Sequence, residues 1–147
     1  MKISRTLLCL LASASASMAS VVFAQSPAGL WKTVDDATGR EKAVIRITEA
    51  SGVFTGKIEK LLDSAKQDSK CDECTDSRKG QPILGLTIIR NIKKGDSHWE
   101  GGDILDAANG KVYRARLTLS ADNKNLDVRG YMGTPMFGRT QTWLRVE

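Results

Sequence analysis

The sequence Gly138-Arg139-Thr140-Gln141-Thr142-Trp143-Leu144-Arg145-Val146 has the alternating pattern of a β-strand. Side chains along a strand point in turn to its two faces, because the side-chain period is two. One face carries Arg139, Gln141, Trp143 and Arg145, and the other carries Thr140, Thr142, Leu144 and Val146. In a closed barrel, a last strand of this kind pairs with the first strand, which here contains Gly29-Leu30-Trp31. We therefore expect the two ends of the domain to meet.

The first 24 residues have the features of a secretory signal peptide. Lys2 and Arg5 give a basic start, residues 6–22 are apolar or small, and small residues precede a cleavage position after Ala24. The alternative is a retained anchoring helix, which the serines that interrupt this segment disfavour. We therefore expect a periplasmic mature protein without a membrane span, made of one domain over residues 25–147.

The composition argues against a nucleic-acid partner. The chain has 22 Lys and Arg against 17 Asp and Glu, which gives a formal net charge of +5, and Lys2 and Arg5 of the leader carry two of the positive charges. Acidic and basic residues alternate through the remainder, whereas nucleic-acid binding requires cations clustered on one face. No basic amphipathic helix suited to a membrane surface is visible. We therefore expect a soluble domain with no nucleic-acid partner.

Alternating patterns and turn signals divide the mature domain into about eight strands. The predicted strands cover residues 29–34, 41–49, 53–61, 83–92, 99–105, 112–120, 125–132 and 138–146. The fourth is ambiguous, because an apolar run interrupted by Gly85 also suits a short helical turn that leads into a strand. Short turns between antiparallel strands fit either a sandwich or an up-and-down barrel. Glycines inside several strands favour tight curvature, and we therefore predict an all-β, eight-stranded antiparallel up-and-down barrel.

Ordered motifs spread along the chain resemble one protein family. They are Gly29-Leu30-Trp31-x-Thr33-x-Asp35-x-x-Thr38-Gly39, Cys71-x-x-Cys74, Gly80-x-Pro82-Ile83-x-Gly85, Trp99-x-Gly101-Gly102-x-Ile104-x-Asp106, Gly110-Lys111-x-Tyr113, and Arg129-Gly130-Tyr131 through Trp143-x-Arg145. In these motifs the chain resembles a bacterial secreted family that is catalogued as a domain of unknown function. That family is described as lipocalin-like, within the calycin superfamily of β-barrels. The resemblance covers essentially the whole mature domain and implies a fold and a compartment, but no activity; one departure is Ala107, where the family often has proline.

The resemblance also implies a contact that closes one end of the barrel. Calycins carry Gly-x-Trp in the first strand, and an arginine from near the other end of the chain covers the indole. Gly29-x-Trp31 matches this pattern, and Arg145 is the candidate arginine. A guanidinium on an indole contributes about 0.5 to 2 kcal/mol. We expect this pair to stabilise the fold, and the alternative is that Trp31 contacts a ligand.

Cys71 and Cys74 are the only cysteines outside the leader, and they lie in a long polar segment, residues 63–81. In an oxidising compartment we expect them to form a disulfide. Its short ring contributes roughly 2 kcal/mol through loop closure, so it orders the segment more than the whole fold. One alternative is a redox-active pair, which the acids Asp72 and Glu73 between the sulfurs disfavour. The other alternative is a metal site.

The sequence offers few metal ligands and no recognisable catalytic set. His98 is the only histidine and is distant in sequence from the cysteines, so we interpret it as a surface side chain. Nearby carboxylates such as Asp76 are hard ligands that match thiolates poorly. No nucleophile elbow and no glycine-rich phosphate loop is present, and Asp35-Asp36 is interpreted as a turn former. We therefore predict no metal, no cofactor and no enzymatic activity.

The barrel interior remains as the place for a ligand. An eight-stranded barrel is wide enough for one small molecule. A cation, an amide and an aromatic ring on one face of the last strand suit an amphipathic molecule with an anionic head. The predicted ligand-binding residues are Arg139, Gln141 and Trp143, with Arg129 and Tyr131 at the same rim. The alternative is that the arginines pair with acids such as Asp127 and that the tryptophan only packs.

Two functions are consistent with these patterns. The first is a periplasmic module that binds a small amphipathic ligand inside the barrel. The second is an envelope interaction or maintenance protein, in which the barrel is filled and the outer surface docks a protein partner. The interior distinguishes them, because a ligand requires an open hollow of roughly 300 Å3 or more that is reached from one end of the barrel.

Overall fold

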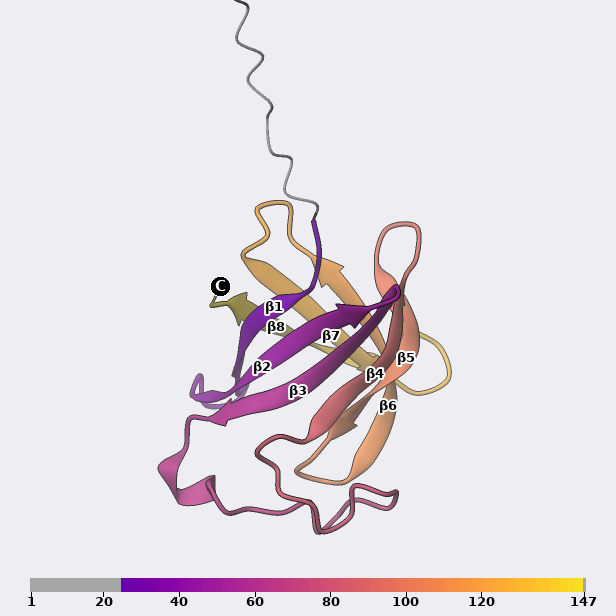
Figure 1. The fold of residues 1–147 in the computed structure, drawn as a ribbon. Helices are drawn as coiled ribbons and strands as arrows, with labels where there is room; N and C mark the ends of the chain where they lie inside the picture. Colours follow the sequence, from indigo (N-terminus) through magenta and orange to yellow (C-terminus); the bar gives the residue numbers. More distant parts are fainter. Residues whose placement is uncertain (1–24, 147) are drawn as a thin grey trace, which may run out of the picture.

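The computed structural model describes residues 25–146, and the predicted signal peptide, residues 1–24, lies outside this range. The described residues form a closed barrel in which each strand pairs with the next (Figure 1). The elements are β1 (Gly29–Val34), β2 (Glu41–Ala50), β3 (Val53–Leu61), η1 (Ser64–Lys66), β4 (Thr87–Lys94), β5 (Trp99–Asp106), β6 (Lys111–Leu119), β7 (Asn125–Tyr131) and β8 (Gly138–Arg145). The predicted all-β antiparallel barrel is confirmed. Within the described range, no helix has the length and apolar character needed to cross a membrane.

β8 closes the barrel by pairing with β1. In this antiparallel pair Trp31 lies opposite Arg145, and Lys32 lies opposite Leu144. On its other side β8 pairs with β7, where Trp143 lies opposite Leu126. An open sandwich would leave β1 and β8 unpaired, so the sandwich alternative is wrong. The first and last strands of the domain therefore meet as the alternating last stretch predicts.

The buried core draws on every strand of the barrel. Its larger members include Trp31, Ile45, Phe54, Ile89, Trp99, Leu117, Leu126 and Trp143. In β2 the burial alternates, since Ala43, Ile45 and Ile47 are buried while the residues between them are more exposed. Glycine permits close strand approach at Gly102, where a Cβ atom would lie only 2.0 Å from the backbone oxygen of Arg90 on β4. Side chains thus occupy much of the barrel interior.

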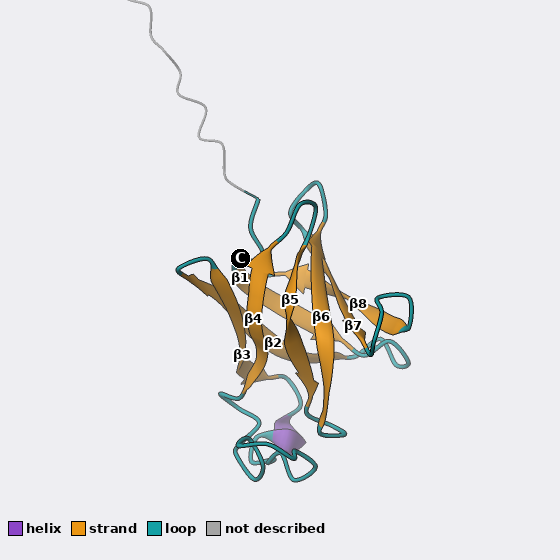
Figure 2. Cartoon of the chain, turned by 90° about the vertical axis from the view of Figure 1, so that its right-hand side faces the viewer, coloured by secondary structure: helices purple, strands orange, loops and turns teal. Residues whose placement is uncertain are grey.

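The barrel has two chemically different ends. We call one the terminal end, because β1 starts and β8 finishes there, beside the turns at residues 51–52, 95–98 and 120–124. We call the other the loop end, which carries the connections at residues 35–40, 62–86, 107–110 and 132–137. Figure 2 shows the 62–86 connection, with the short helix η1, beneath the strands at the loop end. Sites at the two ends are therefore separated by the packed core.

The structure just before β4 resolves the ambiguous prediction for the apolar run at residues 83–92. Residues 83–86 form a bend and turn, and the strand begins only at Thr87. Two backbone hydrogen bonds tie this turn to β3, from Gly85 N to Ile58 O (2.8 Å) and from Ile58 N to Leu86 O (2.9 Å). The run is therefore not a strand throughout. A turn leads into the strand, as in the second interpretation, but this turn is not helical.

Candidate functional site

Arg145 covers Trp31 at the terminal end. Its Cζ lies 4.1 Å from the centroid of the Trp31 ring. The guanidinium donates from Nε to Asn123 O (2.6 Å), from Nη1 to Ala28 O (3.0 Å) and from Nη2 to Ser26 O (2.9 Å). Burial lowers the pKa of Arg145 from its usual value. The indole Nε1 of Trp31 donates to Pro27 O at 2.7 Å, and the ring is fully buried. The pair therefore joins both ends of the domain and leaves no ring face for a ligand.

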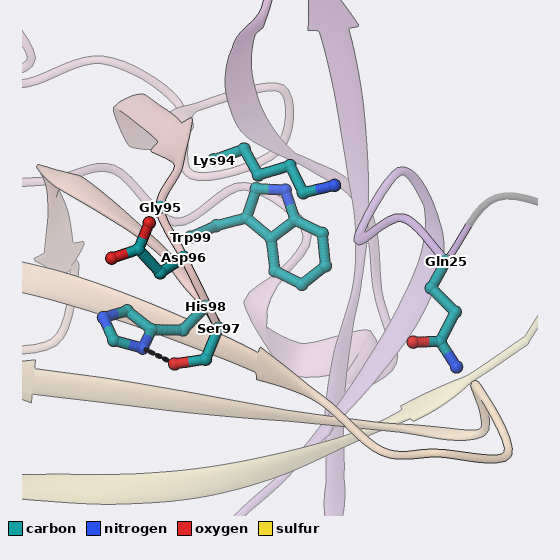
Figure 3. Close-up of a pocket in the computed structure, with 7 residues that line it drawn as sticks. All are labelled: Gln25, Lys94, Gly95, Asp96, Ser97, His98 and Trp99. Atoms are coloured by element: carbon teal, nitrogen blue, oxygen red, sulfur yellow. Dashed lines mark hydrogen bonds between the residues drawn. The ribbon is translucent and has the colours of Figure 1, made fainter.

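A hollow of about 290 Å3 opens at the same terminal end (Figure 3). It is lined by Gln25, Lys94, Gly95, Asp96, Ser97, His98 and Trp99. Trp99 is its aromatic surface, and the indole is held by an edge-on contact with Phe54, with ring centroids 6.3 Å apart. Gln25 stands across from the β4–β5 turn, and its Nε2 donates to Ala121 O at 3.2 Å. The hollow thus lies between the N-terminal segment and the turn that joins β4 to β5.

The polar edge of this hollow is held in place by the β4–β5 turn. The Gly95 backbone N donates to His98 O at 2.7 Å. The imidazole of His98 is 3.0 Å from Ser97 Oγ through Nδ1 and 3.0 Å from Glu100 Oε2 through Nε2. Hydrogen bonds from Arg116, and secondarily from His98, lower the pKa of Glu100. His98 is therefore part of a network that fixes the turn, rather than the isolated surface side chain expected from the sequence.

Lys94 supplies the positive charge of the hollow. Within residues 25–146 it makes no ion pair, and its ammonium group lies near the Trp99 indole in Figure 3. An aromatic face beside an unpaired ammonium suits a small molecule with a flat apolar part and an anionic group. The sequence contained one signal for this hollow. In an up-and-down barrel the turn between the fourth and fifth strands lies at the end where the termini meet, and Trp99 directly follows that turn.

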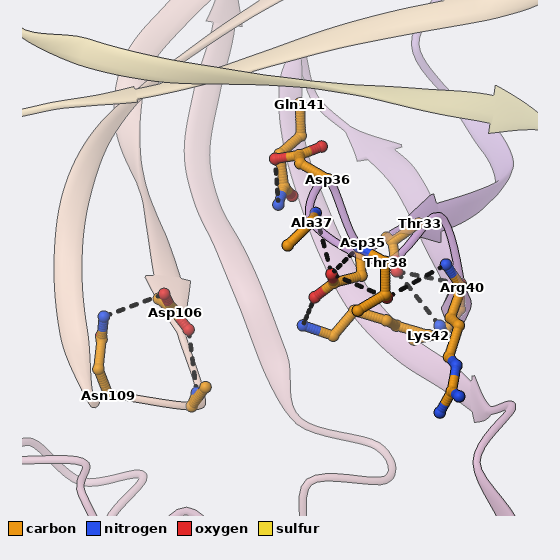
Figure 4. Close-up of polar contacts among 12 residues, drawn as sticks. Thr33, Asp35, Asp36, Ala37, Thr38, Arg40, Lys42, Asp106, Asn109 and Gln141 are labelled. Atoms are coloured by element: carbon orange, nitrogen blue, oxygen red, sulfur yellow. Dashed lines mark hydrogen bonds and ion pairs between the residues drawn. The ribbon is translucent and has the colours of Figure 1, made fainter.

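Arg139 lies at the opposite, loop end of the barrel. Its Nε donates to Asp36 Oδ2 at 3.1 Å, its Nη2 binds the same oxygen, and its side chain is 68% exposed. Gln141 Nε2 approaches that oxygen at 3.4 Å, as Figure 4 shows for Gln141 and Asp36. The hydrogen bond and charge of Asp36 raise the pKa of Arg139, with smaller effects from Asp106 and Asp35. The arginine is therefore already neutralised by an acid from the β1–β2 loop.

Asp35 and Asp36, the two acids of the β1–β2 loop, have different roles. Asp35 accepts hydrogen bonds from Ala37 N (3.1 Å), Thr38 N (2.9 Å) and Thr38 Oγ1 (2.9 Å), which lower its pKa (Figure 4). Asp35 is thus a turn former, as predicted. Asp36 instead binds the last strand, a role that the sequence interpretation missed because the two segments are distant along the chain.

The other predicted ligand residues point in different directions. Trp143 is buried in the core, and its Nε1 is 3.5 Å from Gln141 Oε1. Arg129 binds Pro135 O (2.6 Å), Met136 O (3.3 Å) and Thr140 Oγ1 (2.9 Å). Alternation along β7, in which Leu126 and Val128 are buried, puts Arg129 and Tyr131 on the outer face. The structure therefore groups Arg139, Gln141 and Trp143, and separates Arg129 and Tyr131 from them. The acid suggested as an arginine partner, Asp127, instead accepts a hydrogen bond from Thr142 Oγ1 at 2.7 Å.

The predicted disulfide between Cys71 and Cys74 is confirmed, and both residues are fully buried. Cys71 Sγ lies 3.9 Å from Ala107 O on the β5–β6 turn. A Cβ atom at Gly110 would lie only 1.8 Å from the backbone oxygen of Glu73, so only glycine allows this turn and the disulfide loop to pack so closely. The burial favours the structural interpretation over the redox one. Among residues 25–146, no three metal-ligating side chains are grouped so that they could hold an ion.

Arg78 anchors the same connection to the barrel. Its Nη2 is 2.6 Å from Asp76 Oδ2, and its Nη1 donates to Thr87 O at 3.0 Å at the start of β4. The hydrogen bond from Arg78 lowers the pKa of Asp76 from 3.8 to about 2, with a smaller effect from the charge of Arg90. The 62–86 connection is therefore a packed part of the fold.

A second hollow lies on the outside of the barrel. It encloses about 670 Å3 and is lined by Arg46, Thr48, Thr55, Lys57, Ile58, Glu59, Leu84, Gly85 and Thr87. Arg46 on β2 and Glu59 on β3, two of the residues that line the groove, form an ion pair. This groove lies over the irregular pairing between β3 and β4, where the register shifts near Gly56. It is a surface groove, whereas the hollow over Trp99 is at a barrel mouth.

Comparisons with known proteins agree with this architecture. Residues 29–145 match the model of a family described as "Uncharacterized protein conserved in bacteria (DUF2147)". No curated protein sequence matches the chain. A solved structure described as "Protein HP1028 from the human pathogen Helicobacter pylori belongs to the lipocalin family" is similar, with a TM-score of 0.71, 19% identity and 82% of each chain covered. At this identity the likeness concerns the fold, and that fold is a lipocalin-like barrel.

Proposed function

The chain belongs to this bacterial family of uncharacterized proteins, and we propose that it is a periplasmic small-molecule-binding barrel. The observation that carries the proposal is the hollow over Trp99, which opens at a barrel mouth and combines an aromatic face with the unpaired cation Lys94. The lipocalin-like fold supports binding in preference to catalysis, because such a barrel is built around a mouth that small molecules can enter.

The hollow favours a small, flat, anionic molecule. Its volume of about 290 Å3 is close to the lower limit of roughly 300 Å3 for ligand sites. The small exposed part of Trp99, 7% of the residue, offers an apolar contact, while Lys94 and the Ser97 hydroxyl offer donors to a carboxylate or phosphate. Side chains fill the core below, so the ligand sits at the mouth and does not enter deeply. The amphipathic ligand expected from the sequence is retained in this proposal, at a different position.

The predicted set of Arg139, Gln141, Trp143, Arg129 and Tyr131 stays a prediction for the loop end. Asp36 already neutralises Arg139, and an anionic ligand would have to displace that carboxylate. Lys94 forms no ion pair within the described residues, although Asp96 lines the same hollow. The charge distribution therefore favours the terminal end as the ligand site.

Native mass spectrometry of protein purified from its own host tests the proposal. We expect a co-purifying small anion in the wild type, and at least about tenfold weaker retention in Lys94→Gln, because a charge-assisted hydrogen bond is worth about 1.5 to 3 kcal/mol. Lys93→Gln, which removes an exposed neighbouring charge that does not line the hollow, is the matched control. Loss of the ligand in Arg139→Gln but not in Lys94→Gln would move the site to the loop end, and a wild type without ligand would contradict binding.

The filled interior favours a second candidate function. Large buried side chains from all eight strands occupy the core, which is the arrangement expected of an envelope interaction or maintenance protein. In that case an affinity pull-down from the envelope would recover a protein partner that Lys94→Gln retains.

A further inference from the structure

The loop between β7 and β8 exposes a cluster of large apolar side chains. We call residues 132–137 the apolar tip, since Met132 is 62% exposed, Met136 81% and Phe137 72%. The tip stands clear of the barrel wall in both views (Figures 1 and 2). Single exposed apolar residues are ordinary, but three in one short loop mark an interaction surface.

The tip is held open by specific hydrogen bonds. Arg129 donates to the backbone oxygens of Pro135 and Met136 and to Thr140 Oγ1. Across the loop, Met132 N donates to Phe137 O (3.3 Å) and Phe137 N to Thr134 O (3.1 Å). Because the backbone is already ordered, docking of the tip costs little conformational entropy.

A cation, Arg114, lies beside the tip on the outer face of β6. Arg114 pairs across the strands with Tyr131, the residue before the tip, and is exposed. Arg114 forms no ion pair within residues 25–146. The acid opposite Arg114 on β5 is Asp103, and its carboxylate is bound by Arg90 at 3.2 Å. Val112, two residues before Arg114 on the same face of β6, is also exposed. The apolar tip is thus bordered by unneutralised positive charge.

We propose that the apolar tip docks the protein on an anionic lipid bilayer, with Met136 and Phe137 among the headgroups and Arg114 facing lipid phosphates. A bilayer fits the surface better than a protein does. Three protruding side chains are too few for a stable protein interface, which buries about 800 Å2 on each partner. Shallow apolar insertion beside cations is instead sufficient for reversible attachment to anionic lipid. This inference does not depend on ligand binding, because the tip lies at the loop end.

Co-sedimentation with vesicles tests the proposal. The full mature chain is mixed with vesicles of phosphatidylcholine alone or of phosphatidylcholine with an equal part of phosphatidylglycerol. We expect binding only when phosphatidylglycerol is present. Phe137→Ser should weaken it about tenfold by removing apolar burial, and Arg114→Gln about fivefold by removing one charge.

Matched controls separate the tip from general hydrophobicity and charge. Leu144→Ser removes another exposed apolar side chain, on β8 near the terminal end, and Lys93→Gln removes a cation far from the tip; both should bind as the wild type does. Equal binding by Phe137→Ser and the wild type would overturn the proposal. So would a wild-type dimer in sedimentation velocity that Phe137→Ser converts to monomer, because a second copy would then be the occupant.

Discussion

Arg145 and Arg139 occupy opposite ends of β8 on the face that carries Trp143, yet their surroundings differ completely. Arg145 lies on the Trp31 indole and donates to three backbone carbonyls from two other segments of the chain. Arg139 is mostly exposed and binds a single carboxylate, Asp36. The first guanidinium is enclosed by the fold, whereas the second is attached to its surface.

The role of each arginine therefore depends on its contact partners more than on its position in the strand pattern. Neutral carbonyls and an indole replace much of the water around Arg145, so its removal leaves partly buried acceptors without donors. Water solvates the Asp36 carboxylate when Arg139 is removed, so little unfolding free energy is lost. The terminal end is therefore stabilised by Arg145, while the position of Arg139 at the loop end tolerates change.

The largest expected effect comes from Trp31. Trp31→Ala should cost about 3 to 5 kcal/mol of unfolding free energy, because a fully buried indole is lost from the core. In that background Arg145→Ala should cost about 0.5 to 2 kcal/mol less than in the wild type, because the stacking partner is gone. Urea denaturation followed by circular dichroism measures all four proteins of the cycle. Additive losses would show that the stack contributes nothing, and Trp31→Phe, which keeps an aromatic ring, is the control.

Arg145→Ala alone should lower the unfolding free energy by about 2 to 4 kcal/mol. It removes the cation–π contact and leaves the oxygens of Ser26, Ala28 and Asn123 without their donor. Arg145→Lys should recover only part of this loss, since an ammonium cannot reproduce the planar fork of donors. Full recovery by lysine would mean that charge alone matters at this end.

Arg78 is intermediate, because it donates to a backbone carbonyl as Arg145 does and is paired with a carboxylate as Arg139 is. Asp76→Asn should cost about 1 to 2 kcal/mol at neutral pH by weakening a charge-assisted pair. The pKa of Asp76 is lowered from 3.8 to about 2 in the folded protein. Its contribution is therefore complete above pH 3.8 and is lost as the pH falls through about 2. The difference in urea midpoint between wild type and variant should shrink over that window, and a constant difference would contradict the linkage.

The smallest effect is expected at Arg139. Arg139→Ala should change the unfolding free energy by no more than about 0.5 kcal/mol, because exposed ion pairs are nearly balanced by hydration and side-chain entropy. Added salt should reduce even this difference, since it screens the pair with Asp36. A loss comparable to that of Arg145→Ala would remove the contrast between the two ends.

Much of the fold was accessible from local pattern and from the family resemblance. The alternation of Ala43, Ile45 and Ile47 predicted the buried face of β2, and the last stretch predicted the closing strand. Local pattern was insufficient at residues 83–86, where an apolar run forms a turn because backbone hydrogen bonds to Ile58 hold it against β3.

The candidate site was less accessible from the sequence. Trp99 and Lys94 come together with Gln25 only because strand order brings the β4–β5 turn to the end where the chain enters the barrel. Asp36 reaches Arg139 for the same kind of reason, although the two are far apart in sequence. Neither contact could be predicted from the residues next to it in the sequence.

Most strands, their faces and the disulfide pair were predictable from the amino-acid sequence, because the two-residue alternation is a local property and Cys71 and Cys74 are the only cysteines outside the leader. The fold was needed to show which arginine is enclosed, which acid neutralises the other arginine, and which mouth of the barrel is hollow. These depend on strand register and closure, which place residues from distant segments within contact distance and determine how much water each side chain keeps.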